Sequence, residues 1–146
     1  MDFFSSLEVS SSALAAERTR MNLIAGNMAN ANSTRTAEGG PYKRKDAVFT
    51  AQQPGAPSFG QTLSRFGAAS PQGVEVTAIL EDQSAPRLQF DPKHPDADAK
   101  GFVALPNVNI IEEMADMITA SRAYEANITA AQAAKAMAMK TLELGR

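Results

Sequence analysis

The stretch NIIEEMADMITASRAYEANITAAQAAKAMAMKTLEL, from Asn109 to Leu144, has the pattern of one long amphipathic helix. Its apolar residues recur at spacings of three and four, which places them on one face of a helix. A mean repeat of about 3.5 residues favours a supercoiled seam against other helices. The members of this stripe are Ile110, Met114, Met117, Tyr124, Ile128, Ala131, Ala138 and Leu142.

The ends of this helix carry capping signals. Asn109 can accept a hydrogen bond from the first turn, and Glu112 stands where a capping box places its acidic residue. Gly145 is expected to end the helix. A helix of this length would extend about 50 Å, more than a domain this small would cover by itself. We therefore expect contacts from several sides; the alternative is an intramolecular hairpin that buries both terminal helices.

A second long helix is predicted at the other end of the chain, from Phe3 to Ala31. Three serines at residues 10–12 weaken an isolated helix, but we expect one continuous helix that becomes ordered on packing. Asn30 and Asn32 tolerate the left-handed conformation and predict its C-terminal end. Its apolar stripe has a member every seven residues, at Leu7, Leu14, Met21 and Met28.

Proline and glycine set the middle of the chain apart. All 8 prolines lie between Pro41 and Pro106, among short apolar runs separated by turn formers. Residues 51–72 carry few bulky apolar side chains and predict a flexible loop. The strand-like runs are Tyr42–Thr50, Val74–Leu80, Arg87–Phe90 and Phe102–Leu105. We expect a mainly α protein with a small β insertion, divided into an N-terminal helix (1–35), a central β and loop region (36–106) and a C-terminal helix (107–146).

Composition excludes several classes of function. There are 14 basic and 16 acidic residues, and no segment carries the basic stripe of a nucleic-acid-binding protein. The short run Lys43–Lys45 is interpreted as a solvated loop or strand edge. The absence of cysteine removes disulfides and thiolate chemistry. No apolar run approaches the roughly 20 residues that span a bilayer, and the N-terminus lacks the pattern of a cleaved secretory signal.

The candidate for metal chemistry is DPKHPDAD, residues 91–98, which holds the one histidine, His94, beside three aspartates. An imidazole and several carboxylates could bind a divalent cation. The alternative, which we favour, is a proline-punctuated turn whose aspartates cap their own backbone. No glycine-rich phosphate loop and no serine–histidine–acid set accompanies it. We therefore expect no enzyme, no catalytic residue, no metal ion and no cofactor.

The segment RTRMNLIAGNMANANST, residues 18–34, resembles the N-terminal signature of the bacterial flagellar rod and hook family of axial proteins. Its core is Asn27, Ala29, Asn30 and Thr34, which closes the first helix in that family. Residues 51–72 depart from the family pattern. The other stretches that resemble the family, and within it a subunit of the proximal rod, are GGPYKRKDAVF (39–49), DPKHPDAD (91–98), LPNVNIIEEM (105–114) and SRAYEAN (121–127).

The resemblance implies a structural subunit of the proximal rod of the flagellar basal body, the helical drive shaft that transmits motor torque for motility. It implies polymerisation with itself and with the rod proteins FlgB, FlgF, FlgG and FliE in the periplasm. It also implies export by the flagellar type III apparatus without a cleaved signal peptide. The alternative, from a different class, is a non-polymerising helical-hairpin adaptor of a secretion system.

Two sets of residues are predicted to carry this function. At the end of the first helix, the amides of Asn27 and Asn30 are expected to hydrogen-bond backbone groups that the helix leaves unpaired, next to Thr34 of the same signature. In the alternative, both asparagines face solvent. The assembly interface is expected to comprise Leu7, Leu14, Met21, Ile24, Met28, Ile110, Met114, Met117, Tyr124 and Ile128.

Overall fold

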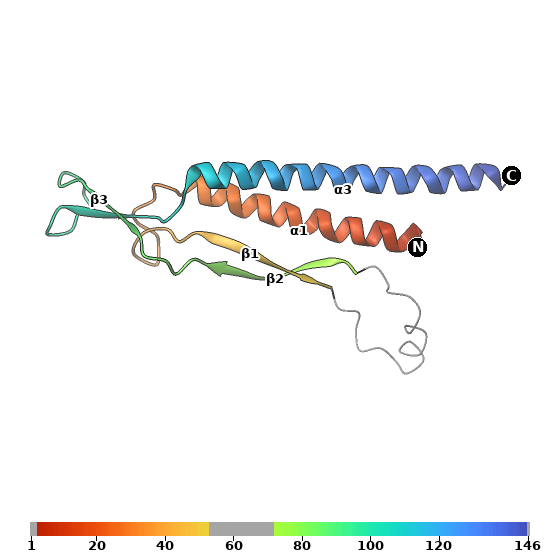
Figure 1. The fold of residues 1–146 in the computed structure, drawn as a ribbon. Helices are drawn as coiled ribbons and strands as arrows, with labels where there is room; N and C mark the ends of the chain where they lie inside the picture. Colours follow the sequence, from red (N-terminus) through yellow and green to blue (C-terminus); the bar gives the residue numbers. More distant parts are fainter. Residues whose placement is uncertain (1–2, 53–71, 146) are drawn as a thin grey trace, which may run out of the picture.

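Two long antiparallel helices lie side by side and form the body of the molecule (Figure 1). The computed structural model describes residues 3–52 and 72–145. The first helix is α1 (Phe3–Ala29) and the last is α3 (Ile110–Leu144). Between them lie β1 (Lys45–Ala51), β2 (Val74–Glu81), β3 (Arg87–Phe90) and β4 (Phe102–Leu105). The predicted class, mainly α with a small β insertion, is confirmed.

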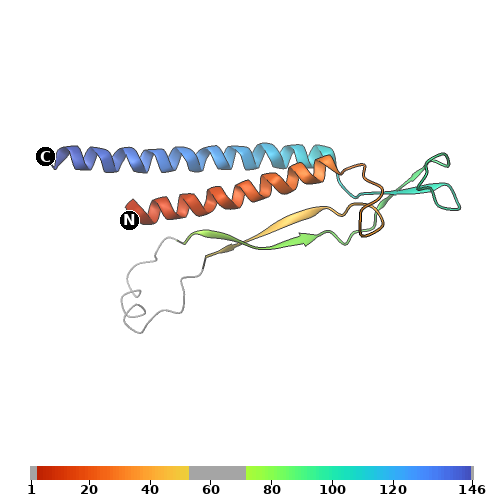
Figure 2. The same cartoon turned by 180° about the vertical axis from the view of Figure 1, so that it is seen from behind.

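The two ends of α3 lie where the sequence predicts them, but the Glu112 side chain does not return a bond to Asn109, so the capping box is not formed. The side chain of Asn109 accepts a hydrogen bond from the backbone N–H of Ile111 at 3.1 Å. At the other end, the N–H of Gly145 donates to the carbonyl of Thr141 at 3.2 Å. With 35 residues the helix reaches about 50 Å. Its C-terminal turns extend beyond the N-terminus of α1 (Figures 1 and 2).

Helix α1 runs without a break through its three serines, as predicted. The hydroxyl of Ser12 donates to the carbonyl of Val9 at 2.8 Å and accepts from the backbone N–H of Val74 at 3.0 Å. A hydroxyl that would disfavour an isolated helix is therefore used in tertiary structure. The helix ends at Ala29, and only glycines have positive φ over the ranges 3–52 and 72–145. The prediction of a left-handed asparagine cap is wrong; Asn30 instead donates its N–H to the carbonyl of Gly26 at 3.1 Å.

Small side chains form most of the seam between the helices. Ala120 and Ala134 of α3 are buried, as are Ala16 and Ile24 of α1. Alanine side chains let two helix backbones approach closely, so the seam is narrow. The helices thus form a hairpin, but not one that buries every apolar residue. Three members of the predicted α3 stripe lie outside this seam and are exposed: Ile110, Met114 and Leu142.

The β region consists of two separate two-stranded sheets rather than one β element. In the first, antiparallel β1 and β2 run from the pair Lys45↔Glu81 to the pair Ala51↔Val74, with a bulge at Val48 and Phe49. This pair, which we call the ribbon, lies along α1 and twists, so that β1 is nearer the helix at its Lys45 end and β2 is nearer at its Val74 end (Figure 1). The predicted run Tyr42–Thr50 therefore begins three residues too early.

The second sheet, β3–β4, projects beyond the ends of the helices and has the predicted bounds (Figure 2). The rings of Phe90 and Phe102 meet edge to face with centroids 5.3 Å apart. The segment DPKHPDAD forms the connecting turn, as the favoured interpretation predicts. Asp91 and Asp98 accept hydrogen bonds from backbone N–H groups within this turn. The predicted flexible loop, residues 51–72, lies almost wholly outside the described residues.

Candidate functional site

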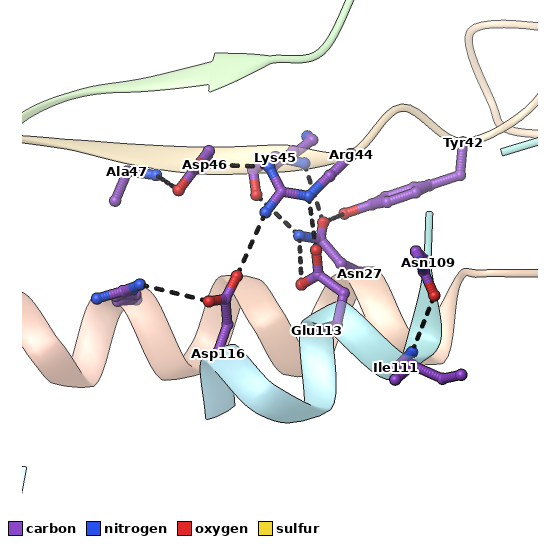
Figure 3. A network of polar contacts seen from close by, with 11 residues as sticks. Asn27, Tyr42, Arg44, Lys45, Asp46, Ala47, Asn109, Ile111, Glu113 and Asp116 are labelled. Atoms are coloured by element: carbon purple, nitrogen blue, oxygen red, sulfur yellow. Dashed lines mark hydrogen bonds and ion pairs between the residues drawn. The ribbon is translucent and has the colours of Figure 1, made fainter. Parts of the chain in front are cut away.

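Asn27 is the most connected side chain of the region where the two helices meet the ribbon (Figure 3). It is 0% exposed. Its Nδ2 donates to the carbonyl of Lys45 at 2.9 Å and to Oε2 of Glu113 at 3.1 Å. Its Oδ1 accepts from the N–H of Lys45 at 2.9 Å and from the hydroxyl of Tyr42 at 3.0 Å. An amide has two donor hydrogens and two acceptor sites, so its hydrogen-bonding capacity is filled.

An ion pair between the buried Glu113 and the half-buried Arg44 completes this arrangement. Glu113 is 1% exposed, and its Oε1 accepts from Nε of Arg44 at 2.6 Å. The guanidinium of Arg44 also lies 3.2 Å from Asp46 and 3.8 Å from Asp116. Burial lowers the pKa of Arg44, but hydrogen bonds and charges from Glu113 and Asp46 outweigh burial and raise it. The arginine is thus held charged against the carboxylate. We call Asn27, Tyr42, Arg44, Lys45 and Glu113 the junction.

Tyr42 contributes to the junction as a donor. Burial is the main cause of the raised pKa of its hydroxyl, and the charge of Glu113 acts in the same direction. The phenol therefore stays protonated at neutral pH and keeps donating to Asn27. In the part of the chain that the structure describes, Asn27 and Glu113 are the polar residues of the buried class. The junction thus contains both of these buried polar residues.

The outer side of α3 is the second feature of the site. Large apolar side chains are exposed near both ends of this helix, where neither α1 nor the ribbon covers them. Folded monomers seldom expose so many together unless the surface meets a partner. Six of them lie on the side of α3 away from its buried residues, and we call these the outer face of α3: Ile110, Ile111, Met114, Ile118, Met139 and Leu142. Met137 and Leu144 are also exposed, but they follow the buried Ala134 by three and ten residues and lie on its side of the helix.

The predicted assembly residues are distributed between the seam and this outer face. Ile24 is buried between the helices. Ile110 and Met114 belong to the outer face. The others are half-buried: Leu7, Leu14, Met21, Met28, Met117, Tyr124 and Ile128. Their role in contacts with other subunits stays a prediction.

The helix-end signature has three different roles. Asn27 bonds the backbone of β1 and the side chain of Glu113. The prediction that its partners are backbone groups left unpaired at the end of α1 is therefore wrong. Asn30 does bond a backbone group, because its Nδ2 donates to the carbonyl of Gly26 at 2.9 Å, but that carbonyl already accepts the N–H of Asn30 and is not one that the helix leaves unpaired. Thr34 donates to Oδ2 of Asp96 at 2.8 Å and ties the segment after α1 to the turn before β4.

Arg44 and Glu113 were not identified by the sequence. The interpretation of Lys43–Lys45 as a solvated loop or strand edge holds for Lys43, which is exposed, and for Lys45, the first residue of β1, but is wrong for Arg44. Glu113 lies in the first turn of α3, where an acidic residue has a sufficient local explanation in the helix dipole. The one available signal was its place within the seam, since Glu113, Ala120 and Ala134 are separated by multiples of seven.

Metal-binding clusters and membrane-spanning helices are absent from the described residues. Among the described residues, no three histidine, cysteine, aspartate or glutamate side chains are grouped so as to hold a metal ion. Within the same residues, no helix has the length and hydropathy of a membrane span. What the site offers is a fully bonded polar junction and an uncovered apolar helix face.

Comparison with known proteins assigns the family. A model described as "Flagella basal body rod protein" matches residues 7–35, and one described as "Flagellar basal body rod FlgEFG protein C-terminal" matches residues 99–144. The flagellar basal-body rod protein FlgC of Borreliella burgdorferi is 42% identical, over 99% of this chain and 98% of that protein. FlgC of Bacillus subtilis is 43% identical over 100% of both chains, and FlgC of Salmonella typhimurium is 40% identical over 95% of both. This is a family of structural proteins and not of enzymes. The chain belongs to the FlgC family of flagellar basal-body rod proteins, and it is a structural subunit of the flagellar rod.

Proposed function

We propose that this rod subunit polymerises through the outer face of α3, which packs against helices of neighbouring rod subunits. The observation that carries the proposal is the exposure of six large apolar side chains on the outer side of one helix of a structural rod subunit. In a helical assembly such a face would be covered by terminal helices of adjacent subunits. The half-buried positions Met21, Met28 and Ile128 would then also be completed by neighbours.

The energetics support an interface that uses many of these side chains at once. Complete burial of one leucine, isoleucine or methionine contributes about 1.5–3 kcal/mol. Association costs about 4–15 kcal/mol in lost freedom of motion. One or two contacts therefore cannot hold a subunit, whereas most of the outer face buried together can. Methionines also adapt their shape to different partners, which suits a subunit that meets several kinds of neighbour.

The finer assignment follows the same reasoning. We place the subunit in the proximal rod, in the periplasm, with copies of itself and FlgB, FlgF, FlgG and FliE as neighbours. Export by the flagellar type III apparatus without a cleaved signal would deliver it there. Its long paired helices, bonded to the ribbon at the junction, would transmit torque because twisting would have to break many contacts together.

Replacing one outer-face residue tests this function. Ile118→Asp is expected to prevent incorporation into rods, because the new carboxylate would be buried without a partner. Thr119→Asp is the matched control, since Thr119 is exposed on α3 beside Ile118 but is not part of the apolar face. Each variant is expressed as the only copy, and basal bodies are purified and assayed for the subunit. Normal incorporation of the Ile118 variant would contradict the proposal.

The adaptor alternative makes a different statement about the purified protein. An adaptor would remain monomeric at all concentrations and bind one partner. A rod subunit should associate as its concentration rises, and Ile118→Asp should suppress that association. Sedimentation velocity over a concentration series measures this association and so separates the two functions. A wild-type chain that stays monomeric in solution and never enters rods in cells would favour the adaptor.

A further inference from the structure

We propose that Glu113, although it belongs to α3, is the positioning residue that keeps the β1–β2 ribbon seated on α1. It acts through Asn27 and Arg44, which bring two other parts of the chain to its carboxylate (Figure 3). The placement of the ribbon is therefore linked to the docking of α3. This inference concerns the internal geometry of the subunit and does not depend on which neighbours it has.

The ribbon is attached to α1 by side-chain hydrogen bonds at both of its ends. At one end, Asn27 bonds the N–H and the carbonyl of Lys45, the first residue of β1. At the other end, Ser12 accepts from the N–H of Val74, the first residue of β2. The 15 residue steps of the helix from Ser12 to Asn27 span about 22 Å at about 1.5 Å each. The strand from Lys45 to Ala51, which pairs with Val74, spans about 20 Å at about 3.3 Å each.

These two attachments differ in what holds them. Ser12 is fixed within its own helix by its bond to Val9, so the Val74 attachment needs nothing from α3. Asn27 is bonded to Lys45 and Tyr42 and, through the second hydrogen of Nδ2, to Glu113 of α3. Without Glu113, that amide hydrogen is left buried without an acceptor, which weakens the orientation in which the amide bonds Lys45.

The position of the chain just before the ribbon also depends on Glu113, through Arg44. It immediately precedes β1, and its Nε is bonded to Glu113 at 2.6 Å. Its other charged neighbours, Asp46 and Asp116, are more exposed and more distant than Glu113. Removing the Glu113 carboxylate therefore releases the chain just before Lys45 as well as the amide that binds Lys45.

Hydrogen exchange of two backbone amides tests the inference on the full chain. The N–H of Lys45 donates to Asn27 and reports on the first attachment, and the N–H of Val74 donates to Ser12 and reports on the second. In Glu113→Ala, exchange at Lys45 should accelerate about tenfold or more while exchange at Val74 changes by less than about twofold. NMR of the labelled protein measures both amides in one sample.

Matched variants separate positioning from general stability. Asp116→Ala removes an acidic residue one turn along α3 that also faces Arg44, and it should leave the Lys45 amide close to wild type. Glu113→Gln keeps the size of the side chain but loses its charge and one acceptor. It should therefore accelerate exchange of the Lys45 amide to an intermediate extent. Ser12→Ala should accelerate exchange of the Val74 amide and leave exchange of the Lys45 amide unchanged.

Three results would overturn the inference. If Lys45 and Val74 accelerate equally in Glu113→Ala together with the amides of α1, Glu113 contributes only to overall stability. If Glu113→Gln exchanges like the wild type at Lys45, the carboxylate does not orient Asn27. If Asp116→Ala accelerates Lys45 as much as Glu113→Ala, the effect comes from the net charge near Arg44 and not from the junction.

Discussion

The side-chain amide of Asn27 donates to the carboxylate of Glu113 at 3.1 Å, although 86 residues separate them in the chain. This contact joins the end of α1 to the start of α3 (Figure 3). It is also the point at which the ribbon begins, because the same amide bonds both backbone groups of Lys45. The three parts of the subunit therefore meet at one buried amide.

Replacing Asn27 by leucine should destabilise the subunit by several kcal/mol, since each buried polar group left without a partner costs about 1–3 kcal/mol. Asn30→Leu should cost less, about 1 kcal/mol, because Asn30 is half-buried and its partners can bind water. Asn22→Leu, at an exposed position of the same helix, is the control. Urea unfolding followed by circular dichroism measures all three. Equal midpoints for the Asn27 and Asn22 variants would contradict the prediction.

Removing Arg44 should be more costly than removing other arginines. Arg44→Met leaves Glu113 buried without its charged partner, a change that costs about 3–5 kcal/mol. Arg18→Met, at an exposed position, should lie within about 0.5 kcal/mol of the wild type. The double variant Arg44→Met with Glu113→Leu should recover part of the loss, because the unpaired charge is gone. A double variant less stable than Arg44→Met alone would show that the lost acceptor for Asn27 outweighs the relief of the unpaired charge.

The sequence predicts the local elements well because their signals are local. The bounds of β3 and β4 are those expected from short apolar runs between turn residues. The cap at Asn109 and the end at Gly145 follow from single residues. The same reasoning overestimates β1, because the aromatic and basic residues before Lys45 look like a strand but Tyr42 and Arg44 instead turn toward the junction.

The junction could not be predicted in the same way. Arg44 and Glu113 are 69 residues apart, and each has a sufficient local explanation, as a solvated loop residue and as a helix-dipole residue. Only the antiparallel packing of α3 on α1 brings them together. The outer face was also hidden, since the apolar stripe of α3 is wider than its alanine seam, and periodicity alone does not say which part faces α1.

A methyl group at Gly73 should disturb the second attachment of the ribbon. A Cβ at this position would lie 2.7 Å from the hydroxyl oxygen of Ser12 and 2.7 Å from Oε1 of Gln52. Such overpacking costs about 1–3 kcal/mol, so Gly73→Ala should lower the urea midpoint. If steric conflict with the hydroxyl is the cause, the same change should cost less in a Ser12→Ala background. An equal cost in both backgrounds would exclude the conflict with Ser12.

Charges placed on the half-buried sides of the two helices should abolish rod assembly while leaving export intact. Met21 of α1 and Ile128 of α3 are half-buried in the subunit, and in our proposal neighbouring subunits cover the rest of each side chain. Met21→Asp or Ile128→Asp would then bury a carboxylate without a partner at every contact between subunits. Each such burial costs several kcal/mol, about as much as removing one partner from a buried ion pair.

The adjacent exposed positions provide controls that differ by one residue: Asn22→Asp for Met21 and Thr129→Asp for Ile128. Each variant is supplied as the only copy in motile cells, exported subunit is measured by fractionation, and completed basal bodies are counted by electron microscopy. We expect exported protein without rods for Met21→Asp and Ile128→Asp, and normal rods for the two controls. Motile cells carrying Met21→Asp or Ile128→Asp would refute the prediction, because a buried, unpaired charge at a repeated contact leaves no route to a stable filament.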